Sequence, residues 1–331
     1  MPLSTTYPRL LADVGGTNVR FALIHHAGAG ISDERNLVCA DYPGLFDAAR
    51  AYLDPLKVAP RWAAIGIATA VADDLIRMTN NHWAFSQAAL KAQLQLAELS
   101  IINDFTALAL SLPLLDQAEL VKIGGGEPDP HQPIALLGAG TGLGVSGLVP
   151  AHQPGEAGRW IPLQGEGGHV SFSPFNDKED EILRILRREF GHVSAERLLS
   201  GPGLVNLYRA LGELNGQPPA PLSAAEISAQ GVDGSCPLCR EVIDTFCGML
   251  GTAAANLAVT LGARGGLYIG GGIVPKLGGY FATSAFRKRF EQKGRFSNYL
   301  AAVPSYVIVA NNPALRGTAA ALDALAARRG G

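Results

Sequence analysis

The sequence predicts an α/β protein of two domains, and three observations support this prediction. The chain has 331 residues, which is long for one small domain. Strand-like and helix-like segments alternate along it, as is typical of sheets that are at least partly parallel. Each half opens with an apolar strand, a glycine-rich tip and a second strand, at residues 10–24 and 134–149. We therefore expect two α/β halves of related design.

The first half begins with a hairpin, because apolar and polar residues alternate after its tip. Val19, Phe21 and Leu23 alternate with polar or small neighbours, which is the period of a half-buried strand. Ser86 is placed to cap a helix and Pro113 to end one. The expected elements after the hairpin are a strand at 63–69, a helix at 86–96, a strand at 99–102 and a helix at 105–112.

The second half opens with the hairpin at 134–149 and continues with helices. Ser194 is expected to cap a helix that ends near Gly201 and Pro202. The other expected elements are helices at 180–190 and 241–262, a strand at 267–269 that runs into glycines 270–272, and a last helix at 314–328. Similarity between the halves outside the glycine tips is weak, although an old duplication would produce this arrangement.

Composition indicates a soluble globular protein. The chain is 47% hydrophobic and 17% charged, and its net charge of −2 argues against a nucleic-acid or anionic-membrane partner. Two uncharged stretches, 134–151 and 246–263, are interrupted by Gly, Thr or Asn, so we interpret them as buried core. No basic segment followed by an apolar run opens the chain, and the expected location is cytoplasmic.

Four cysteines, Cys39, Cys236, Cys239 and Cys247, are few for this length and fit a reducing compartment. Cys236 and Cys239 have the C-x-x-C spacing of zinc ligands, but no second pair of ligands follows them. Two ordinary cysteines near the start of a helix are the alternative.

The two glycine tips predict a polyphosphate site. Glycines let backbone N–H groups approach an anion closely, and Thr17 and Thr141 add hydroxyl donors. Tight hairpin turns that need a positive φ are the alternative for each tip. A P-loop is excluded because the chain contains no Gly-Lys pair. Residues 142–147 match G-x-G-x-x-G, but a strand rather than a helix is expected after them, which disfavours a dinucleotide fold.

Asp13 precedes the first tip, where a carboxylate would repel a phosphate unless a cation lay between them. Mg²⁺ prefers carboxylate, water and phosphate oxygens, so Asp13 is a candidate Mg²⁺ residue acting through water. A capping or hairpin-stabilising Asp is the alternative.

A second polar set suits a ligand with many hydroxyl groups. Asn103 and Asp104 follow a strand at its carboxyl end, where α/β proteins place ligands and where Asp can accept a proton from an attacking hydroxyl. A helix N-cap is the alternative for this pair. The remaining polar candidates are Asn80, Glu166, His169 and Glu196. Together these groups offer the donors and acceptors that each hydroxyl requires.

Seven ordered motifs resemble those of the bacterial glucokinases, in the hexokinase/actin-like ATPase superfamily and outside its zinc-containing repressor–kinase branch. They are ADVGGTN (12–18), MTNNHW (78–83), INDFTALAL (102–110), GAGTGLG (138–144), EGGHVSF (166–172), SAERLLSGPGL (194–204) and GGGIVPKL (270–277). The resemblance implies a two-lobed actin-like ATPase fold, of the ribonuclease H-like kind, with a cleft between a smaller domain (1–113 plus 312–331) and a larger one (114–311).

The resemblance also implies an activity: transfer of the ATP γ-phosphoryl group to the 6-hydroxyl of D-glucose, with Mg²⁺, by a cytoplasmic homodimer. Asp104 would be the general base, and the tips would hold the phosphates. The sugar would be held by Asn80, Asn103, Asp104, Glu166, His169 and Glu196. The nucleotide would be held by Asp13, Gly15, Gly16, Thr17, Asn18, Gly138, Gly140, Thr141, Gly142, Gly271, Gly272 and Ile273.

One segment departs from the family pattern. Family members usually have Cys-Pro-x-x-Gly-Asp before the MTN motif, whereas Thr69–Asp74 stands here, and its missing Pro and Gly are expected to loosen a loop near the sugar. A hexose kinase of other specificity, a non-catalytic sugar sensor and a plain ATPase remain the alternative functions.

Overall fold

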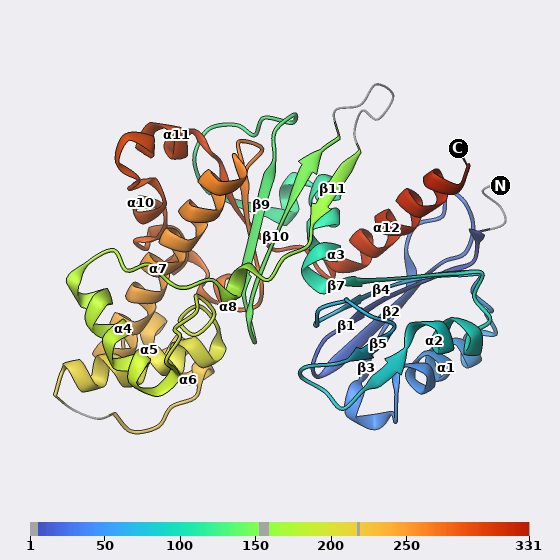
Figure 1. Cartoon of the computed structure of the whole chain (residues 1–331), viewed down its shortest axis with the longest axis horizontal. Coiled ribbons are helices and arrows are strands. Elements are labelled where there is room, and N and C mark those ends of the chain that lie inside the picture. Colours follow the sequence, from blue (N-terminus) through green and yellow to red (C-terminus); the bar gives the residue numbers. More distant parts are fainter. Residues whose placement is uncertain (1–5, 152–158, 217–218, 331) are drawn as a thin grey trace. The chain divides into compact units, whose positions relative to one another are not determined.

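The chain divides into two compact units in the computed structural model. The first unit is made of residues 1–115 and 310–331, and the second of residues 116–309. The structure describes residues 6–151, 159–216 and 219–330. Each unit is built on its own sheet, and we describe each unit by itself (Figure 1).

The first unit has a five-stranded sheet in the order β3-β2-β1-β4-β7. Neighbouring strands β1, β2 and β3 are antiparallel, whereas β4 and β7 run parallel to β1. The hairpin expected at 10–24 is therefore confirmed. The strands are β1 (Arg9–Val14), β2 (Asn18–Ile24), β3 (Ser32–Val38), β4 (Trp62–Ile67) and β7 (Glu98–Asn103), and the small hairpin β5 (Leu75–Arg77) and β6 (Ala84–Ser86) lies outside this sheet.

Register places the chemically interesting ends of β1 and β7 at the same edge of this sheet. Asp13 pairs with Gly66 on β4, and Ile67 at the end of β4 pairs with Asn103 on β7. The carboxyl ends of three parallel strands therefore meet there, as the α/β prediction requires.

The described residues of the first unit also form the α-helices α1 (Leu45–Leu56), α2 (Gln87–Gln93), α3 (Asp104–Ser111) and α12 (Pro313–Gly330). The hydroxyl of Ser86 accepts a hydrogen bond from Ala89 N and caps α2, as expected, although the helix ends before residue 96. Helix α12 is the last helix of the chain, and it packs beside α3 of the first unit (Figure 1). This contact needs Gly317, because a Cβ there would collide with the Ala107 carbonyl.

The second unit has a six-stranded sheet in the order β11-β10-β9-β12-β13-β8. Strands β9 and β10 form the expected second hairpin, and β12 and β13 run parallel to β9. The strands are β8 (Leu120–Gly124), β9 (Ile134–Ala139), β10 (Leu143–Pro150), β11 (Trp160–Leu163), β12 (Leu267–Gly270) and β13 (Ser305–Ile308).

Helix α7 (Pro237–Leu261) runs through the core of the second unit, where side chains such as Phe246 and Leu250 are fully buried. By length and composition it could cross a membrane, but 67% of its apolar window is buried inside the protein, as in the core helix of a globular domain. The other α-helices are α4 (Asp177–Phe190), α5 (Gly201–Leu214), α6 (Ala224–Asp233), α8 (Ile273–Leu277), α9 (Gly279–Thr283), α10 (Phe286–Glu291) and α11 (Ser297–Ala302).

One expected helix is wrong. No α-helix forms between Ser194 and Ser200; Ser194 instead makes an isolated bridge with Ser171, and a series of turns follows. The helix begins at Gly201, where Ser200 is the N-cap and Pro202 lies in the first turn. Proline is favoured at that position because its missing N–H has no helical partner to lose, so Pro202 starts a helix rather than ending one.

The two units share one strand order. Strands β3-β2-β1-β4-β7 correspond in order and direction to β11-β10-β9-β12-β13, and β8 is an addition at the edge of the second sheet. This correspondence supports the two related halves expected from the two tips.

Candidate active site

Asn103 and Asp104 stand where β7 passes into α3 in the first unit. Asn103 is the N-cap of α3, since its Oδ1 accepts hydrogen bonds from the backbone N–H groups of Phe105 (2.9 Å) and Thr106 (3.3 Å). Its Nδ2 donates to the Thr69 carbonyl at 3.4 Å. The capping alternative for Asn103 is therefore confirmed, and its side chain also interacts with the Asp104 carboxylate.

Asp104 is a carboxyl group in an unusual electrostatic environment. Burial, and secondly the nearby Asp13 carboxylate, raise the pKa of Asp104 to about 7. One of its oxygens accepts a hydrogen bond from Phe105 N at 2.9 Å, which fixes the orientation of the group. A carboxylate that titrates near neutral pH is suited to accept a proton from a reacting hydroxyl.

Asp13 lies near the end of β1 at the same sheet edge. Burial raises the pKa of Asp13, and Arg20 on β2 partly offsets this effect through an ion pair of 3.4 Å. Burial raises the pKa of both carboxyl groups, and Asp13 also raises that of Asp104. No group of three or more His, Cys, Asp or Glu that could hold a metal occurs among the described residues.

The first tip is held in place by its neighbours. Within the tip, Gly15 N donates to the Asn18 carbonyl at 2.9 Å, and Cys39 N donates to the Thr17 carbonyl at 2.8 Å. Asn81 Nδ2 donates to the Gly15 carbonyl at 3.1 Å. Gly16 lies against Asn80, because a Cβ on Gly16 would come within 2.8 Å of the Asn80 Cβ. The tip and the loop that contains Asn80 therefore form one local structure.

Sequence reasoning missed two residues of this region. Asn81 joins the loop to the tip, and its Oδ1 also accepts from Trp83 N at 2.9 Å. Arg20 pairs with Asp13 across the hairpin, where the two residues are in register. The alternation of apolar and polar residues along β2 predicted a hairpin that contains both Asp13 and Arg20. Counting outward from the tip of that hairpin could have identified the two residues as partners.

The segment Thr69–Asp74 is tied to its surroundings. Thr69 Oγ1 hydrogen-bonds to the hydroxyl of Thr79 at 3.0 Å and to the Arg77 carbonyl at 3.3 Å. At its other end, Asp74 Oδ1 accepts from Ala88 N in the first turn of α2 at 2.9 Å. These contacts anchor the segment, which the missing Pro and Gly of the family pattern were expected to loosen.

The second tip, Gly140–Gly142, is held by backbone hydrogen bonds and lies against the Glu196 carboxylate, which a Cβ on Gly142 would approach to 2.5 Å. Gly140 N donates to the Gly142 carbonyl and Gly201 N donates to the Gly140 carbonyl, both at 2.8 Å. Gly271, with φ of +79°, lies so close to Ala139 that a Cβ would collide with its carbonyl oxygen. Gly138 lies within β9 and pairs with Gly270, so it adjoins the tip rather than forming it. Thr141 at the tip and Gly272 after β12 are exposed, and Ile273 begins α8.

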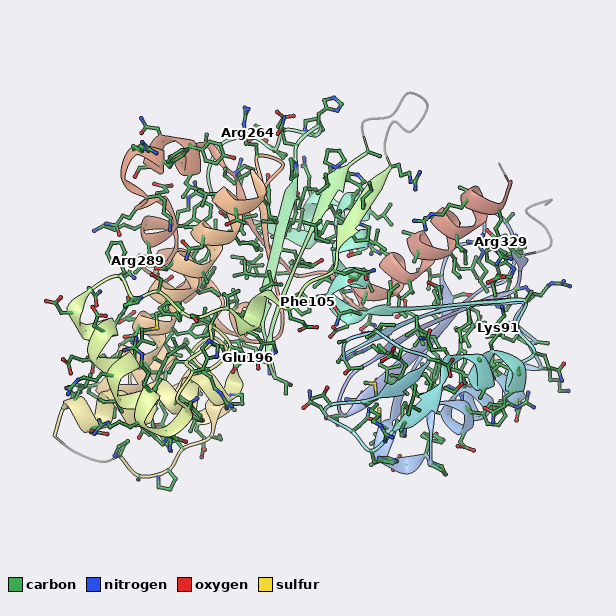
Figure 2. All side chains as sticks on the ribbon, in the orientation of Figure 1. Lys91, Phe105, Glu196, Arg264, Arg289 and Arg329 are labelled. Carbon is green, nitrogen blue, oxygen red and sulfur yellow. The ribbon has the colours of Figure 1, made fainter. Side chains whose placement is uncertain are left out.

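Glu166, His169 and Glu196 come together beside this second tip. Glu166 precedes the short turn η5 (Gly167–His169) and His169 ends it, and both residues are exposed. Glu196 lies on the loop between α4 and α5 (Figure 2), where its N donates to the Gly168 carbonyl at 2.9 Å. Its carboxylate accepts a hydrogen bond from Leu143 N, also at 2.9 Å. Glu196 therefore links the turn to the start of β10.

The predicted site residues thus form two sets. The first unit brings together Asp13, the first tip, Asn80, Asn103 and Asp104. The second unit brings together the second tip, the glycines after β12, Glu166, His169 and Glu196.

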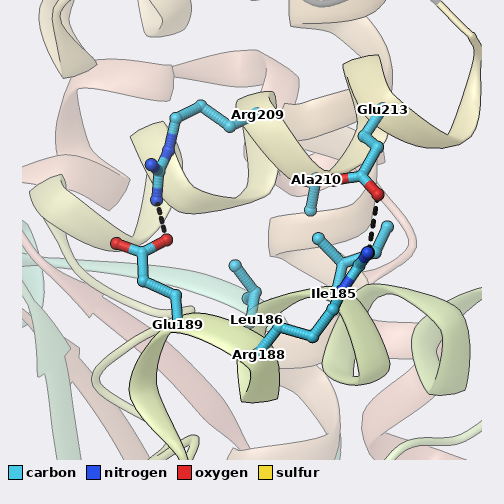
Figure 3. Close-up of a pocket in the computed structure, with 7 residues that line it drawn as sticks. All are labelled: Ile185, Leu186, Arg188, Glu189, Arg209, Ala210 and Glu213. Atoms are coloured by element: carbon cyan, nitrogen blue, oxygen red, sulfur yellow. Dashed lines mark hydrogen bonds and ion pairs between the residues drawn. The ribbon is translucent and has the colours of Figure 1, made fainter.

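A pocket of about 320 Å³ between α4 and α5 contains none of these residues (Figure 3). Its charged side chains already pair with one another, Arg188 with Glu213 at 2.6 Å and Arg209 with Glu189 at 2.7 Å. All four charged side chains that line this pocket are therefore engaged in ion pairs.

Comparison with known proteins identifies the family. Residues 10–325 match a protein-family model described as glucokinase. The chain belongs to the glucokinase family. It is 54% identical to a glucokinase of Aromatoleum aromaticum over 99% of this chain and 98% of that protein. It is also 54% identical to a glucokinase of Chromobacterium violaceum, over 98% of this chain and 92% of that protein.

Solved structures of glucokinases have the same fold. The crystal structure of a glucokinase from an Antarctic psychrotroph is 38% identical, with a TM-score of 0.85 over 96% of this chain and 98% of that one. A ROK-family glucokinase from Streptomyces griseus, in complex with glucose and AMPPNP, is 18% identical with a TM-score of 0.61, over 96% and 99%, and this likeness concerns the fold. The expected two-lobed actin-like ATPase fold is confirmed.

Proposed function

We propose that this chain transfers the γ-phosphoryl group of ATP to the 6-hydroxyl of D-glucose, with Asp104 as the general base. Membership of the glucokinase family supports the overall reaction. The observation that supports the base is the raised pKa of Asp104, about 7, at the carboxyl end of β7 beside Asp13. A base with this pKa is available at neutral pH and still basic enough to take a hydroxyl proton.

The geometry of Asp104 indicates how it would act. Phe105 N holds one carboxylate oxygen at 2.9 Å, which leaves the other oxygen to accept the hydroxyl proton as the sugar oxygen attacks phosphorus. General-base help of this kind is worth about 10²–10⁴-fold in rate. The rest of the acceleration would come from alignment and charge stabilisation, which dominate phosphoryl transfer.

The two glycine tips would bind the phosphates through their backbone N–H groups. This role fits Gly140 in the second tip, since the nearest atom to a Cβ there would be Gly272 N at 3.9 Å and the backbone is open to an anion. Gly272 and Ile273 would adjoin the adenosine. When bound with the nucleotide, Mg²⁺ would be held through water by Asp13 and would neutralise phosphate charge.

The sugar would be bound by amide and carboxyl groups of both sets. Asn80, Asn103 and Asp104 belong to the first unit, whereas Glu166, His169 and Glu196 belong to the second. Each hydroxyl needs a donor and an acceptor, and these residues supply both. Hydrogen bonds of this kind, where the bound sugar shields them from water, can reject an epimer by up to about 10⁴–10⁵-fold. We further propose that the enzyme is a cytoplasmic homodimer with no nucleic-acid or membrane partner.

ADP release measured with and without sugar tests this function. The protein should release ADP only with MgATP and sugar, and glucose should be used more efficiently than mannose, fructose or N-acetylglucosamine. Equal efficiency on all four sugars would indicate a broader hexose kinase. Release without sugar would indicate a plain ATPase, and no release at all would indicate a sugar sensor.

A further inference from the structure

Two of the four cysteines share the first turn of α7, in the second unit and outside both sets of site residues. Cys236 is the N-cap of this helix and is half-buried, whereas Cys239 is fully buried one turn later. The intervening Pro237 occupies the first turn, where proline is favoured. The sequence Cys-Pro-Leu-Cys thus begins a 25-residue helix.

Cys236 and Cys239 are in contact at this turn. Cys236 Sγ accepts a hydrogen bond from Cys239 N at 3.3 Å. Disulfides join Cβ atoms about 3.5–4.5 Å apart, which is closer than the about 5–6 Å typical of residues three apart on a helix. Because Cys236 is the N-cap and its backbone is extended rather than helical (φ −126°, ψ 111°), a Cys236–Cys239 disulfide requires an adjustment at this residue and not within the helix itself.

The two sulfurs have opposite acid–base character. Burial by itself would raise the pKa of Cys236, but hydrogen bonds from the Cys239 and Leu238 backbone and from the Cys239 side chain bring it below its ordinary value. Burial raises the pKa of Cys239 to about 12, with contributions from Cys236 and Asp233. An accessible thiol of lowered pKa beside a buried partner is the arrangement of an attacking and a resolving cysteine.

The surroundings favour thiol chemistry over a metal. The only further polar side chain that contacts the buried thiol is Gln230, whose Oε1 lies 4.0 Å from Cys239 Sγ in the part of the chain that the structure describes. No cluster of three or more His, Cys, Asp or Glu occurs in the described ranges. The zinc interpretation of the C-x-x-C spacing therefore lacks its remaining ligands. Ser235 and Pro237, on either side of Cys236, are exposed and leave a route for a small reagent.

We propose that Cys236 and Cys239 form a dithiol–disulfide couple that exchanges with low-molecular-weight disulfides, with Cys236 as the attacking thiol. This inference does not depend on the sugar kinase activity. The other two cysteines serve as internal references, because Cys39 is 1% exposed, Cys247 is fully buried, and burial raises the pKa of both.

The exchange balances in two steps. The Cys236 thiolate attacks one sulfur of the small disulfide RS–SR, the S–S bond breaks, and RS⁻ leaves and takes up a proton. Cys239 then loses its proton and attacks the Cys236 sulfur of the mixed disulfide, which releases the second RS⁻ as RSH. The protein dithiol is oxidised by two electrons and the small disulfide is reduced to two thiols.

Incubation of the native full-length protein with oxidised glutathione, followed by intact-mass and peptide mass spectrometry, tests the proposal. The wild type should become lighter by two hydrogen atoms, with the disulfide mapped to Cys236 and Cys239. The Cys239→Ala variant should stop at one glutathione adduct on Cys236. The Cys236→Ser variant should form neither product, and it should fold because serine is a favoured N-cap.

The Cys247→Ala variant is the matched control, since it also removes a buried thiol of α7 and should still form the Cys236–Cys239 disulfide. Circular dichroism of each variant confirms that it is folded. Four free thiols in the oxidised wild type would overturn the proposal. A stable adduct on wild-type Cys236 would also overturn it, because Cys239 would then fail to resolve the mixed disulfide.

Discussion

The ends of β1 and β9 occupy equivalent places in two sheets of the same strand order, yet they carry different chemistry. Near the end of β1 stands Asp13, and Asp104 follows β7 at the same sheet edge. Near the end of β9 stands Gly138, and Gly271 follows the neighbouring strand β12. Shared topology fixes where the sites lie, and the residues there decide what each does. We propose that the first edge handles the proton and a cation and that the second contacts the phosphates.

Among the variants that test this comparison, Asp104→Asn should show the largest effect, which is a loss of turnover. The variant keeps the shape of the side chain but cannot accept the hydroxyl proton, so kcat should fall at least about 100-fold while glucose affinity stays within a few-fold. Steady-state kinetics and glucose titration calorimetry provide the measurement. The matched control is Asp177→Asn, which changes an exposed acid in the first turn of α4. Near-wild-type turnover of Asp104→Asn would remove this residue from the role of base.

The next largest effect should be a fall in kcat/KM at low pH. A base with a pKa of about 7 is protonated below that pH, so kcat/KM should fall about tenfold per pH unit on the acid side and level off above it. Because Asp13 raises the pKa of Asp104, the Asp13→Asn variant should move this limb to lower pH. A limb near pH 4 in the wild type would mean that another group, or an unperturbed carboxylate, limits the reaction.

Gly140→Ala should test the second edge with a smaller effect. A Cβ at Gly140 has room, since its nearest neighbour is Gly272 N at 3.9 Å, so the protein should fold normally. The same methyl group would stand between the tip and a phosphate and weaken a charged hydrogen bond, so KM for ATP should rise about tenfold, or about 1.4 kcal/mol. Gly165→Ala, also with no atom nearby, is the control. An unchanged KM would show that this tip does not contact phosphate.

Thermal stability should show the smallest effect. The folded-state pKa of Asp104 is raised above 3.8, so its contribution to stability is fully present below about pH 4 and is lost as the pH rises through about 7. At pH 8 the Asp104→Asn variant, which has no charge to bury, should therefore melt a few degrees above the wild type. This difference should vanish near pH 4 in differential scanning fluorimetry. A lower Tm for the variant at pH 8 would contradict the raised pKa.

Much of the fold was predictable because its signals are local, whereas the roles of the residues in each site set came mainly from the family motifs and stay predictions. Period-two alternation and glycine tips identified both hairpins, and the position of Asn103 and Asp104 after an apolar strand identified the acid edge. The helix expected after Ser194 was wrong because serine and acidic residues favour turns as well as helix starts.

Contacts between distant segments could not be read from the sequence. The Glu196 carboxylate meets Leu143 N across 53 positions, and Asn81 meets Gly15 across 66. Both depend on tertiary packing, which no local pattern records. The raised pKa of Asp104 was equally out of reach, since it results from burial and from a carboxylate on another strand.

The most direct test is a carboxyl-carbon NMR titration of Asp104 in the ligand-free protein, with aspartate labelled and the signal assigned through Asp104→Asn. The midpoint should lie near pH 7 in the wild type and move to lower pH in Asp13→Asn. A midpoint close to the ordinary 3.8 in both proteins would contradict the claim that the first edge holds a half-buried base whose pKa is raised by its neighbour Asp13.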